Sequence, residues 1–347
     1  MILKNKKLFI IVFFACLISL LYFPESYALA NVEKKIIQHD RRIREYFIYT
    51  PPSYKENKSV PLLMVFHGGK GKAKKFARFT GFNNLSEKYG FIVAYPQGID
   101  GHWNDGRQSE RFKAHDKDID DVGFVMALIE NLKANFNIDQ NKIFATGMSN
   151  GGIFCQRLAV EQSQHFTAIA SVTAQMAESL AKRFNPQKPI SVLIMNGTDD
   201  PLLPYSGGEV KDIAFFPRLP RLRRKPSRGR VLSTAATIDL WLKHNQILTH
   251  STMKKMTDID NDGVTVELKE WTNKRKGVSV VLYKIKSGGH TWPGGKQYLP
   301  ERVIGKTCMD INASELIWDF FLSNAKYLTP IRPRMSREKT FPVEDFR

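Results

Sequence analysis

Short apolar runs alternate with amphipathic stretches through most of this chain. Each run is four to seven residues long and is bounded by polar or glycine-rich segments, which is typical of a buried strand. Between the runs, apolar residues recur three and four positions apart, as on one face of a helix. This alternation predicts an α/β fold, a mostly parallel sheet with helices on both faces. The apolar runs occupy 61–66, 91–95, 143–146 and 189–195. One helical pattern ends near 89, and the others cover 120–132, 153–158, 233–244 and 316–321.

The remaining segments complete the predicted order of elements. Residues 44–49 alternate between polar and apolar and predict an early, half-exposed strand. Residues 264–271 and 278–285 predict two strands joined by a polar turn. The segment 96–118 is rich in Gly, Asp and Asn and carries Trp103, so it predicts a long functional loop.

Four positions with reactive side chains directly follow predicted strands. They are His67, Ser149, the pair Asp199 and Asp200, and His290. In parallel sheets, ligands bind beyond the carboxyl ends of the strands. We therefore expect these side chains to meet at one edge of the sheet.

Ser149 lies in a glycine-rich turn between a predicted strand and a predicted helix. The turn Gly147-Met148-Ser149-Asn150-Gly151 fits the pattern G-x-S-x-G. A serine on such a turn has a strained backbone, and the glycines two residues to either side keep the space around it clear. The turn also aims the first amides of the helix at the space beside the hydroxyl, where they can bind an anion. Ser149 is therefore the candidate nucleophile.

A serine hydroxyl needs a base to take its proton. His290, in a glycine-flanked loop after a strand, is the candidate base. The base in turn needs a carboxylate to fix its tautomer, and either Asp199 or Asp200 can supply it. The chain order Ser, Asp, His is that of the α/β-hydrolases.

The sequence also offers two backbone donors for an oxyanion. One is the amide of Asn150, directly after the candidate nucleophile, and the other is the amide of Gly69 in the segment His67-Gly68-Gly69. Donors of this kind are typically worth about 3–4 kcal/mol of transition-state stabilisation each. We expect His67 itself to shape the loop and not to act as an acid or base.

Seven motifs together resemble the exported esterase family of polyhydroxybutyrate depolymerases and feruloyl esterases, over Arg44 to Phe321. The resemblance implies an α/β-hydrolase fold, the nucleophile Ser149, the base His290 and, directly before a proline, the acid Asp200. Asp199 departs from the family pattern, because a small neutral residue is usual there. The motifs are His67-Gly-Gly, Tyr95-Pro-Gln-Gly98, Trp103-Asn-Asp-Gly106, Asp120-Asp-Val-Gly-Phe124, Thr146-Gly-Met-Ser-Asn-Gly-Gly152, Gly197-Thr-Asp-Asp-Pro-Leu-Leu-Pro-Tyr205 and Gly289-His-Thr-Trp-Pro-Gly294.

The same resemblance implies an activity and a pocket. The activity is hydrolysis of carboxylic esters through an acyl-enzyme, with no cofactor and no metal, on a small ester, an oligomeric hydroxyalkanoate or a plant cell-wall ester. Trp103 and Trp292 are expected to line or support the pocket. Two alternatives stay open: a serine peptidase on the same fold, and a non-catalytic protein that binds carbohydrate or a surface.

Composition and charge add a partner hypothesis. The chain has 347 residues, 42% of them hydrophobic, and a net charge of +18, which favours contact with anionic surfaces or acidic polymers. No recognition motif accompanies this charge, so no specific nucleic-acid partner is expected. A basic insertion near 206–230 either overhangs the site and favours acidic or surface-bound substrates, or forms a solvated loop. Its basic residues are Lys211, Arg218, Arg221, Arg223, Arg224, Lys225, Arg228 and Arg230.

The two ends of the chain differ in composition from the predicted esterase domain at 31–325. Residues 1–30 have a lysine-rich start, an apolar run at 8–23 and Ala28-Leu29-Ala30, which predict a signal peptide cleaved after Ala30 and a secreted or periplasmic protein. The apolar run is shorter than the roughly 20 residues that a membrane anchor needs. Residues 326–347 form a basic tail.

Two further patterns concern cysteine and calcium. Cys155 and Cys308 would remain after cleavage, and either a disulfide or two buried free thiols is consistent with the sequence. The segment 258–263 matches the start of an EF-hand loop, but the twelfth position is Lys269 and not Glu. We therefore expect a hairpin turn there.

Overall fold

A computed structural model describes residues 32–116, 119–212, 226–248 and 251–325 of the chain. The predicted signal peptide at 1–30, the basic tail at 326–347 and residues 213–225 of the basic insertion lie outside the described residues. The described part is built on one ten-stranded sheet, and a short two-stranded sheet lies beside it.

The large sheet has a parallel centre and antiparallel edges. Its strand order is β1-β2-β4-β3-β5-β6-β7-β12-β11-β10, and every neighbouring pair from β4 to β12 is parallel. The pairs outside this centre are antiparallel. The strands are β1 Glu33–His39, β2 Arg42–Tyr49, β3 Val60–Phe66, β4 Ile92–Pro96, β5 Ile138–Met148, β6 Ala168–Val172, β7 Ser191–Gly197, β10 Thr252–Lys255, β11 Thr265–Asn273 and β12 Val278–Lys286, with β8 Gly208–Glu209 and β9 Arg230–Val231 forming the small sheet.

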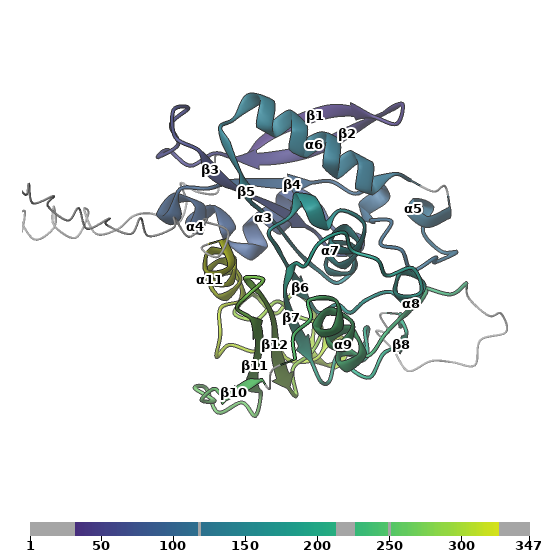
Figure 1. The fold of residues 1–347 in the computed structure, drawn as a ribbon. Helices are drawn as coiled ribbons and strands as arrows, with labels where there is room; N and C mark the ends of the chain where they lie inside the picture. Colours follow the sequence, from purple (N-terminus) through teal and green to yellow (C-terminus); the bar gives the residue numbers. More distant parts are fainter. Residues whose placement is uncertain (1–31, 117–118, 213–225, 249–250, 326–347) are drawn as a thin grey trace, which may run out of the picture.

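Helices cover both faces of the sheet, as the sequence pattern predicts. Helices α6, α7 and α9 pack on one face, and α3, α4 and α11 pack on the other (Figure 1). The α-helices are α3 Ala73–Thr80, α4 Phe82–Tyr89, α5 Lys113–Asp116, α6 Asp121–Asn135, α7 Asn150–Glu161, α8 Glu178–Ala181, α9 Thr234–His244, α10 Glu301–Ile304 and α11 Ala313–Ala325, and two short 3₁₀ turns are η1 Ile99–Gly101 and η2 Ser163–His165.

Strand β3 shows why its continuous apolar run needs helices on both sides. Leu62 and Met64 point into the core under α6 and α7, whereas Leu63 and Val65 point into the core under α3, α4 and α11. All four are at most 1% exposed. Successive side chains of a strand alternate between faces, so a strand that is apolar throughout is stable only when both faces are covered.

The structure confirms the predicted strands and helices and adds elements that the pattern missed. The most important addition is β6, which is buried between β5 and β7. Its sequence Ala-Ile-Ala-Ser-Val is short and three of its five side chains are small, so the strand signal of Ile169 and Val172 is weak. The edge strands β1 and β10 were missed because they are mostly exposed and carry no apolar run.

Both cysteines of the described domain are free and buried. Cys155 lies in α7, and Cys308 precedes α11. The disulfide alternative is therefore wrong, and the alternative of two buried thiols is confirmed. Burial raises the pKa of the Cys155 thiol well above its usual value, so it stays protonated. Among the described residues, none of the helices has the length and apolar character required to cross a membrane.

We expect Ile194→Ala in β7 to destabilise the protein by about 2–5 kcal/mol, because a buried isoleucine leaves a cavity when it is shortened. Ile194 is 0% exposed and lies in the middle of the parallel strands. The matched control is Ile36→Ala in the edge strand β1, where the side chain is 62% exposed. Urea unfolding of both variants measures the difference, and equal losses would contradict this account of the core.

Candidate active site

Ser149 lies on the sharp turn between β5 and α7. Its backbone has φ 57° and ψ −124°, a conformation that costs a non-glycine residue about 1–3 kcal/mol. Its amide donates a hydrogen bond of 2.9 Å to the carbonyl of Val172 at the end of β6. The strand–turn–helix context that the sequence predicts is therefore present, and the missed strand β6 holds the turn.

The glycines around Ser149 are required by close backbone contacts. A Cβ added to Gly147 would lie 2.7 Å from the backbone of Gly151 and 2.7 Å from the carbonyl oxygen of Phe66. A Cβ added to Gly151 would overlap the carbonyl oxygens of Phe66 and His67. Each distance is shorter than a carbon–oxygen contact allows, so the end of β3 can approach the serine turn only if both positions are glycine.

His67 fixes the loop after β3. It is 0% exposed, and its Nδ1 lies 2.8 Å from the carbonyl of Gly68, while its Nε2 accepts a hydrogen bond of 3.0 Å from the amide of Gly98. An Nε2 that accepts from a backbone amide carries no proton, so the ring is neutral with its proton on Nδ1. Burial lowers the pKa of His67 to about 4, in agreement with this tautomer. The contacts are those of a loop-shaping residue.

The loop after β3 lies directly against the serine turn. A Cβ added to Gly68 would be 3.5 Å from the Cβ of Ser149, and one added to Gly69 would be 3.8 Å from the Cβ of Asn150. Gly69, Ser149 and Asn150 all line the same cavity. The structure thus brings together the two residues whose amides are the candidate oxyanion donors, beside the candidate nucleophile.

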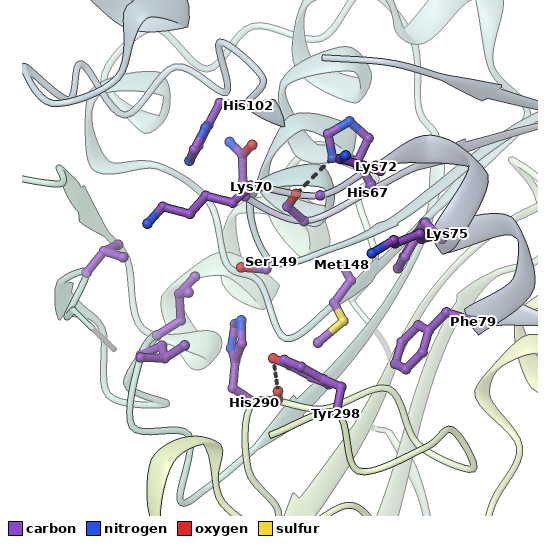
Figure 2. A pocket seen from close by; sticks show the side chains of 18 of the residues that line it. His67, Lys70, Lys72, Lys75, Phe79, His102, Met148, Ser149, His290 and Tyr298 are labelled. Atoms are coloured by element: carbon purple, nitrogen blue, oxygen red, sulfur yellow. Dashed lines mark hydrogen bonds between the residues drawn. The ribbon is translucent and has the colours of Figure 1, made fainter. Parts of the chain in front are cut away.

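Asp200 and His290 form a buried pair. Asp200 Oδ2 lies 2.7 Å from His290 Nδ1, and the two side chains are 2% and 3% exposed. The other carboxylate oxygen, Oδ1, accepts hydrogen bonds from the amides of Leu202 at 2.8 Å and Leu203 at 2.9 Å. The carboxylate is therefore held at both oxygens, and the pair leaves the Nε2 of His290 free to serve another group. Figure 2 shows the imidazole of His290 turned toward Ser149 within the cavity.

The two neighbouring aspartates have different surroundings. Asp199 is exposed, and its Oδ1 accepts a hydrogen bond of 2.8 Å from the hydroxyl of Thr198. Asp200 is 6% exposed and faces His290. Of the two candidates that the residues left open, Asp200 is the one in contact with the histidine.

The side chain of Asn150 ties the serine turn to the loop that carries Trp103. Its Oδ1 accepts from the amide of Trp103 at 2.8 Å, and its Nδ2 donates to the carbonyl of Trp103 at 3.0 Å and to Asp105 Oδ2 at 2.6 Å. Asp105 also accepts from the Nε of Arg107 at 2.8 Å. Asn150 and Asp105 are buried, so this network fixes the first residue of α7 against the 102–107 loop.

The cavity around Ser149 has a volume of about 440 Å³ and a mixed lining. Figure 2 shows Lys70 between His102 and Ser149 on one side, and Phe79 and Tyr298 on the other. A pocket of this size fits a small ester or one end of a longer one. Its apolar lining residues are Phe76, Phe79, Met148, Leu202, Leu203 and Val210, and its cationic lining residues are Lys70, Lys72, Lys75, Arg107 and Arg228.

Trp103 and Trp292 support this cavity from behind and do not line it. The indole of Trp103 is 0% exposed and donates to the carbonyl of His67 at 3.0 Å. The indole of Trp292 is 2% exposed, donates to Ser314 Oγ at 3.1 Å and packs edge-on against Phe76. Of the two positions expected for these residues, lining or supporting the pocket, their burial and contacts agree with a supporting one.

Several cavity residues were missed at the sequence level. Arg107 directly follows the motif Trp103-Asn-Asp-Gly106, so its place in the sequence could have indicated a position near the site. Tyr298 donates through its hydroxyl to the carbonyl of His290 at 2.9 Å and so braces the histidine loop, but it lies in a polar segment without a motif. Arg228 is the one basic residue of the insertion that lines the cavity within the described part of the chain, and Val210 of the same segment lines it too.

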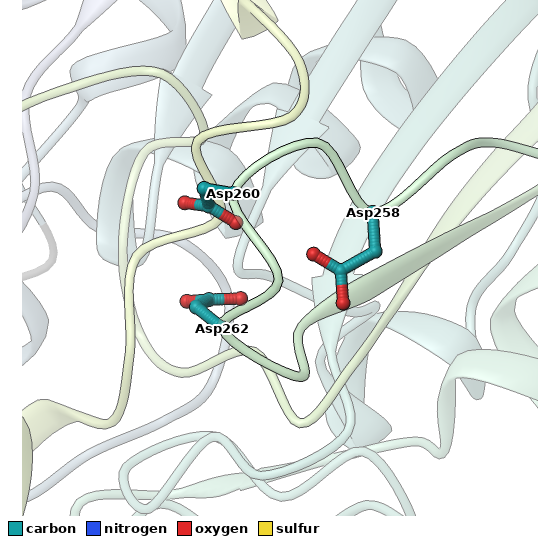
Figure 3. A group of neighbouring side chains, drawn as sticks. All are labelled: Asp258, Asp260 and Asp262. Atoms are coloured by element: carbon teal, nitrogen blue, oxygen red, sulfur yellow. The ribbon is translucent and has the colours of Figure 1, made fainter.

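Asp258, Asp260 and Asp262 form an acidic group outside this site (Figure 3). Their carboxylate oxygens lie within 4.8 Å of one another in the connection between β10 and β11. These strands pair antiparallel, so the predicted hairpin is confirmed. Asp262 Oδ1 accepts from the amide of Val264 at 2.7 Å, and Asp258 Oδ2 accepts from the amide of Gly263 at 3.3 Å. These hydrogen bonds are those of a polar turn.

The strand order, the serine turn after β5 and the buried pair after β7 and β12 define an α/β-hydrolase fold. One solved structure similar to this chain is an acetyl xylan esterase from Aspergillus awamori, at a TM-score of 0.48 and 12% sequence identity, covering 73% of this chain and 92% of the other. The fold assignment rests on the topology and not on that likeness.

The resemblance to polyhydroxybutyrate depolymerases and feruloyl esterases is confirmed by comparison with known proteins. The family model of the esterase PHB depolymerases matches residues 44–182. The chain is 28% identical over 263 residues to NocK, an inferred esterase of Nocardia uniformis subsp. tsuyamanensis, covering 76% of this chain and 74% of that protein. It is 24% identical over 264 residues to feruloyl esterase B of Piromyces equi, covering 73% of this chain and 44% of that protein.

We expect acid to destabilise the fold through His67. The pKa of His67 is about 4 in the folded protein and 6.5 unperturbed, so the unfolded chain takes up a proton between these pH values and the folded chain does not. The contribution of His67 to the free energy of unfolding should therefore be fully present above pH 6.5. It should fall by roughly 3 kcal/mol as the pH drops to 4.

Chemical denaturation from pH 7.5 to 4 measures this effect. His67→Gln should have a shallower decline than the wild type, and the exposed control His165→Gln should keep the wild-type slope. A His67→Gln slope equal to that of the wild type would show that other groups cause the acid sensitivity.

Proposed function

We propose that this protein is a serine esterase that hydrolyses carboxylic esters through an acyl-enzyme. The observation that carries the proposal is the common cavity of Ser149 and His290, with His290 paired at 2.7 Å to Asp200. The matches to the PHB depolymerase family model and to feruloyl esterase B support an ester as the substrate. The proposal names no metal or cofactor.

In the first half of the reaction, Ser149 Oγ attacks the carbonyl carbon of the ester. The Nε2 of His290 accepts the hydroxyl proton, and Asp200 stabilises the resulting imidazolium while holding the ring by Nδ1. The negative charge that develops on the carbonyl oxygen is met by the amides of Gly69 and Asn150. The Asn150 amide is at the N-terminus of α7, where the helix dipole also favours an anion.

In the second half, His290 gives its proton to the departing alcohol oxygen, and the acyl group stays on Ser149. Water then enters the cavity, His290 accepts a proton from it, and the hydroxide formed attacks the acyl carbon. Collapse of the second tetrahedral intermediate returns the proton to Ser149 Oγ and releases the acid. His102 has no role as a base in this proposal, because burial lowers its pKa to about 4 and makes it a weak proton acceptor.

The setting of this reaction is a second part of the proposal. The lysine-rich and apolar segment at 1–30 supports export, with cleavage after Ala30. The natural ester is then one that reaches a secreted or periplasmic enzyme: a small ester, an oligomeric hydroxyalkanoate or a plant cell-wall ester. The basic insertion near 206–230 would also favour anionic surfaces.

The aspartate pair gives a matched test of the acid. Asp200→Asn should lower kcat for a 4-nitrophenyl ester by about 10⁴-fold, because an amide cannot hold the histidine tautomer that the mechanism needs. Asp199→Asn should retain nearly full activity, since Asp199 is exposed and contacts Thr198. If Asp199→Asn is the inactive variant, the assignment of the acid is wrong.

Covalent labelling tests the nucleophile directly. A fluorophosphonate probe should label the wild-type protein once, at Ser149, as read by mass spectrometry of the peptides. Ser149→Ala should abolish both labelling and ester hydrolysis, whereas the exposed Ser59→Ala should change neither. Folded wild-type protein that stays unlabelled would favour the non-catalytic alternative, and faster cleavage of matched amides than of esters would favour the peptidase.

A further inference from the structure

The charged lining of the cavity has a single sign. Within the described part of the chain, its lysines and arginines face no lining carboxylate, because Asp200 lies behind His290 and is not among the lining residues. An ester group is neutral and forms no ion pair with these cations. The charge is therefore a feature that the proposed ester chemistry leaves unexplained.

Arg107 and Arg228 are the most buried of these cations, and the segments that carry them are in contact. A Cβ added to Gly229 would lie 2.7 Å from both the Cβ and the carbonyl oxygen of Arg107, so the segment carrying Arg228 passes directly over Arg107. The side chain of Arg107 is 2% exposed and that of Arg228 is 22% exposed. Both guanidinium groups therefore belong to one mostly buried wall of the cavity, and the positive charge of Arg107 contributes to lowering the pKa of Arg228. Like charges in such a place are unfavourable without an anion.

The acceptors already present bind only some of the N–H groups of each arginine. Asp105 binds the Nε of Arg107 at 2.8 Å, and no described contact engages the two terminal nitrogens of Arg107. Arg228 uses Nη1 on the carbonyl of Lys211 and on Asp212 Oδ1 at 3.5 Å, and its buried Nε has no hydrogen-bond partner. A buried N–H group without a partner is rare and costs free energy, so it marks a place where an acceptor is missing.

The surroundings do not neutralise this pair. Asp212 is shared with Arg111, so one carboxylate serves two guanidinium groups. Burial, with Arg107 as the next contribution, lowers the pKa of Arg228 to about 10, so Arg228 remains charged at neutral pH. Burial also keeps His102, which stacks on Phe112 beside the pair, neutral.

We propose that the cavity selects esters that carry a carboxylate, with the terminal nitrogens of Arg107 and the free N–H of Arg228 binding that carboxylate while Ser149 attacks the ester carbon. The planar fork of a guanidinium matches the two oxygens of a carboxylate. Lys70, which lies between His102 and Ser149, adds a third cation near the path of the substrate (Figure 2). The apolar side chains of the cavity then contact the rest of the substrate. This inference rests on the proposed esterase function.

Two matched pairs of substrates test the selectivity. The first pair places the carboxylate on the acyl side: 4-nitrophenyl adipate as the monoester, against 4-nitrophenyl heptanoate. The second places it on the alcohol side: 3-acetoxybenzoate against 3-acetoxytoluene. The wild-type enzyme should prefer the carboxylate member of at least one pair by about tenfold or more in kcat/KM, because a hydrogen bond between two charged groups is roughly twice as strong as a neutral one. Higher ionic strength should reduce the preference.

Arg228→Gln should lower kcat/KM for the preferred carboxylate ester by about 10-fold to 100-fold, mainly through KM, and change the neutral ester less than about twofold. Arg228→Lys, which restores the charge but not the fork, should recover part of the loss. The control is Arg230→Gln, since Arg230 is exposed, pairs with Glu178 at 2.9 Å and does not line the cavity. This control should behave as the wild type on both substrates, and thermal unfolding should confirm that every variant is folded.

The outcomes separate this inference from the esterase proposal. Equal activity on both members of both pairs, or equal losses on both members in Arg228→Gln, overturns the inference and leaves the esterase in place. If the wild type hydrolyses none of the four esters, calorimetry with the inert Ser149→Ala protein decides the inference independently. The monoadipate should then bind Ser149→Ala about tenfold or more tightly than it binds the Ser149→Ala/Arg228→Gln protein, and equal affinities overturn the inference.

Discussion

The close approach of β3 to the serine turn is the constraint on which the rest of the site depends. The carbonyl oxygens at the end of β3 lie where side chains at Gly147 and Gly151 would otherwise be, and the neighbouring strand β6 accepts the amide hydrogen of Ser149. Ser149 keeps its strained φ of 57° because these strands hold it from two sides. A strained residue persists only where its surroundings determine its conformation, and here the central sheet provides them.

The same constraint extends to the far wall of the cavity through buried polar contacts. Asn150, the first residue of α7, binds the backbone of Trp103 with its side chain and also donates to Asp105. Asp105 in turn orients Arg107, which lines the cavity. The backbone beside the candidate nucleophile and the cation that faces it are therefore parts of one network. A substitution at either residue should shift the position of the other, because buried polar networks are rigid only while every member has its hydrogen-bond partners.

Much of this arrangement could be predicted because it follows from strand ends. His67, Ser149, Asp200 and His290 follow β3, β5, β7 and β12, whose carboxyl ends meet at one edge of the sheet. The residues by themselves could not decide between Asp199 and Asp200, since neighbouring residues differ only in which side chain turns inward, and Asp200 was favoured by the family resemblance. It also missed β6, whose small residues carry little strand signal, and the pairing of Arg107 with Arg228, which joins segments 121 positions apart through the contact at Gly229. The sequence left open whether Trp103 and Trp292 line or support the pocket, because aromatic motifs do not reveal how deeply a side chain is buried.

The buried thiols Cys155 and Cys308 bear on how this protein reaches its native state. Neither sulfur is cross-linked, so the described domain is held by non-covalent interactions alone. Folding of the described domain therefore requires no oxidant and no disulfide isomerase, and a reducing agent breaks no covalent bond in it. The thiols can react only when the chain is unfolded, because exposed cysteines can then form incorrect disulfides between molecules.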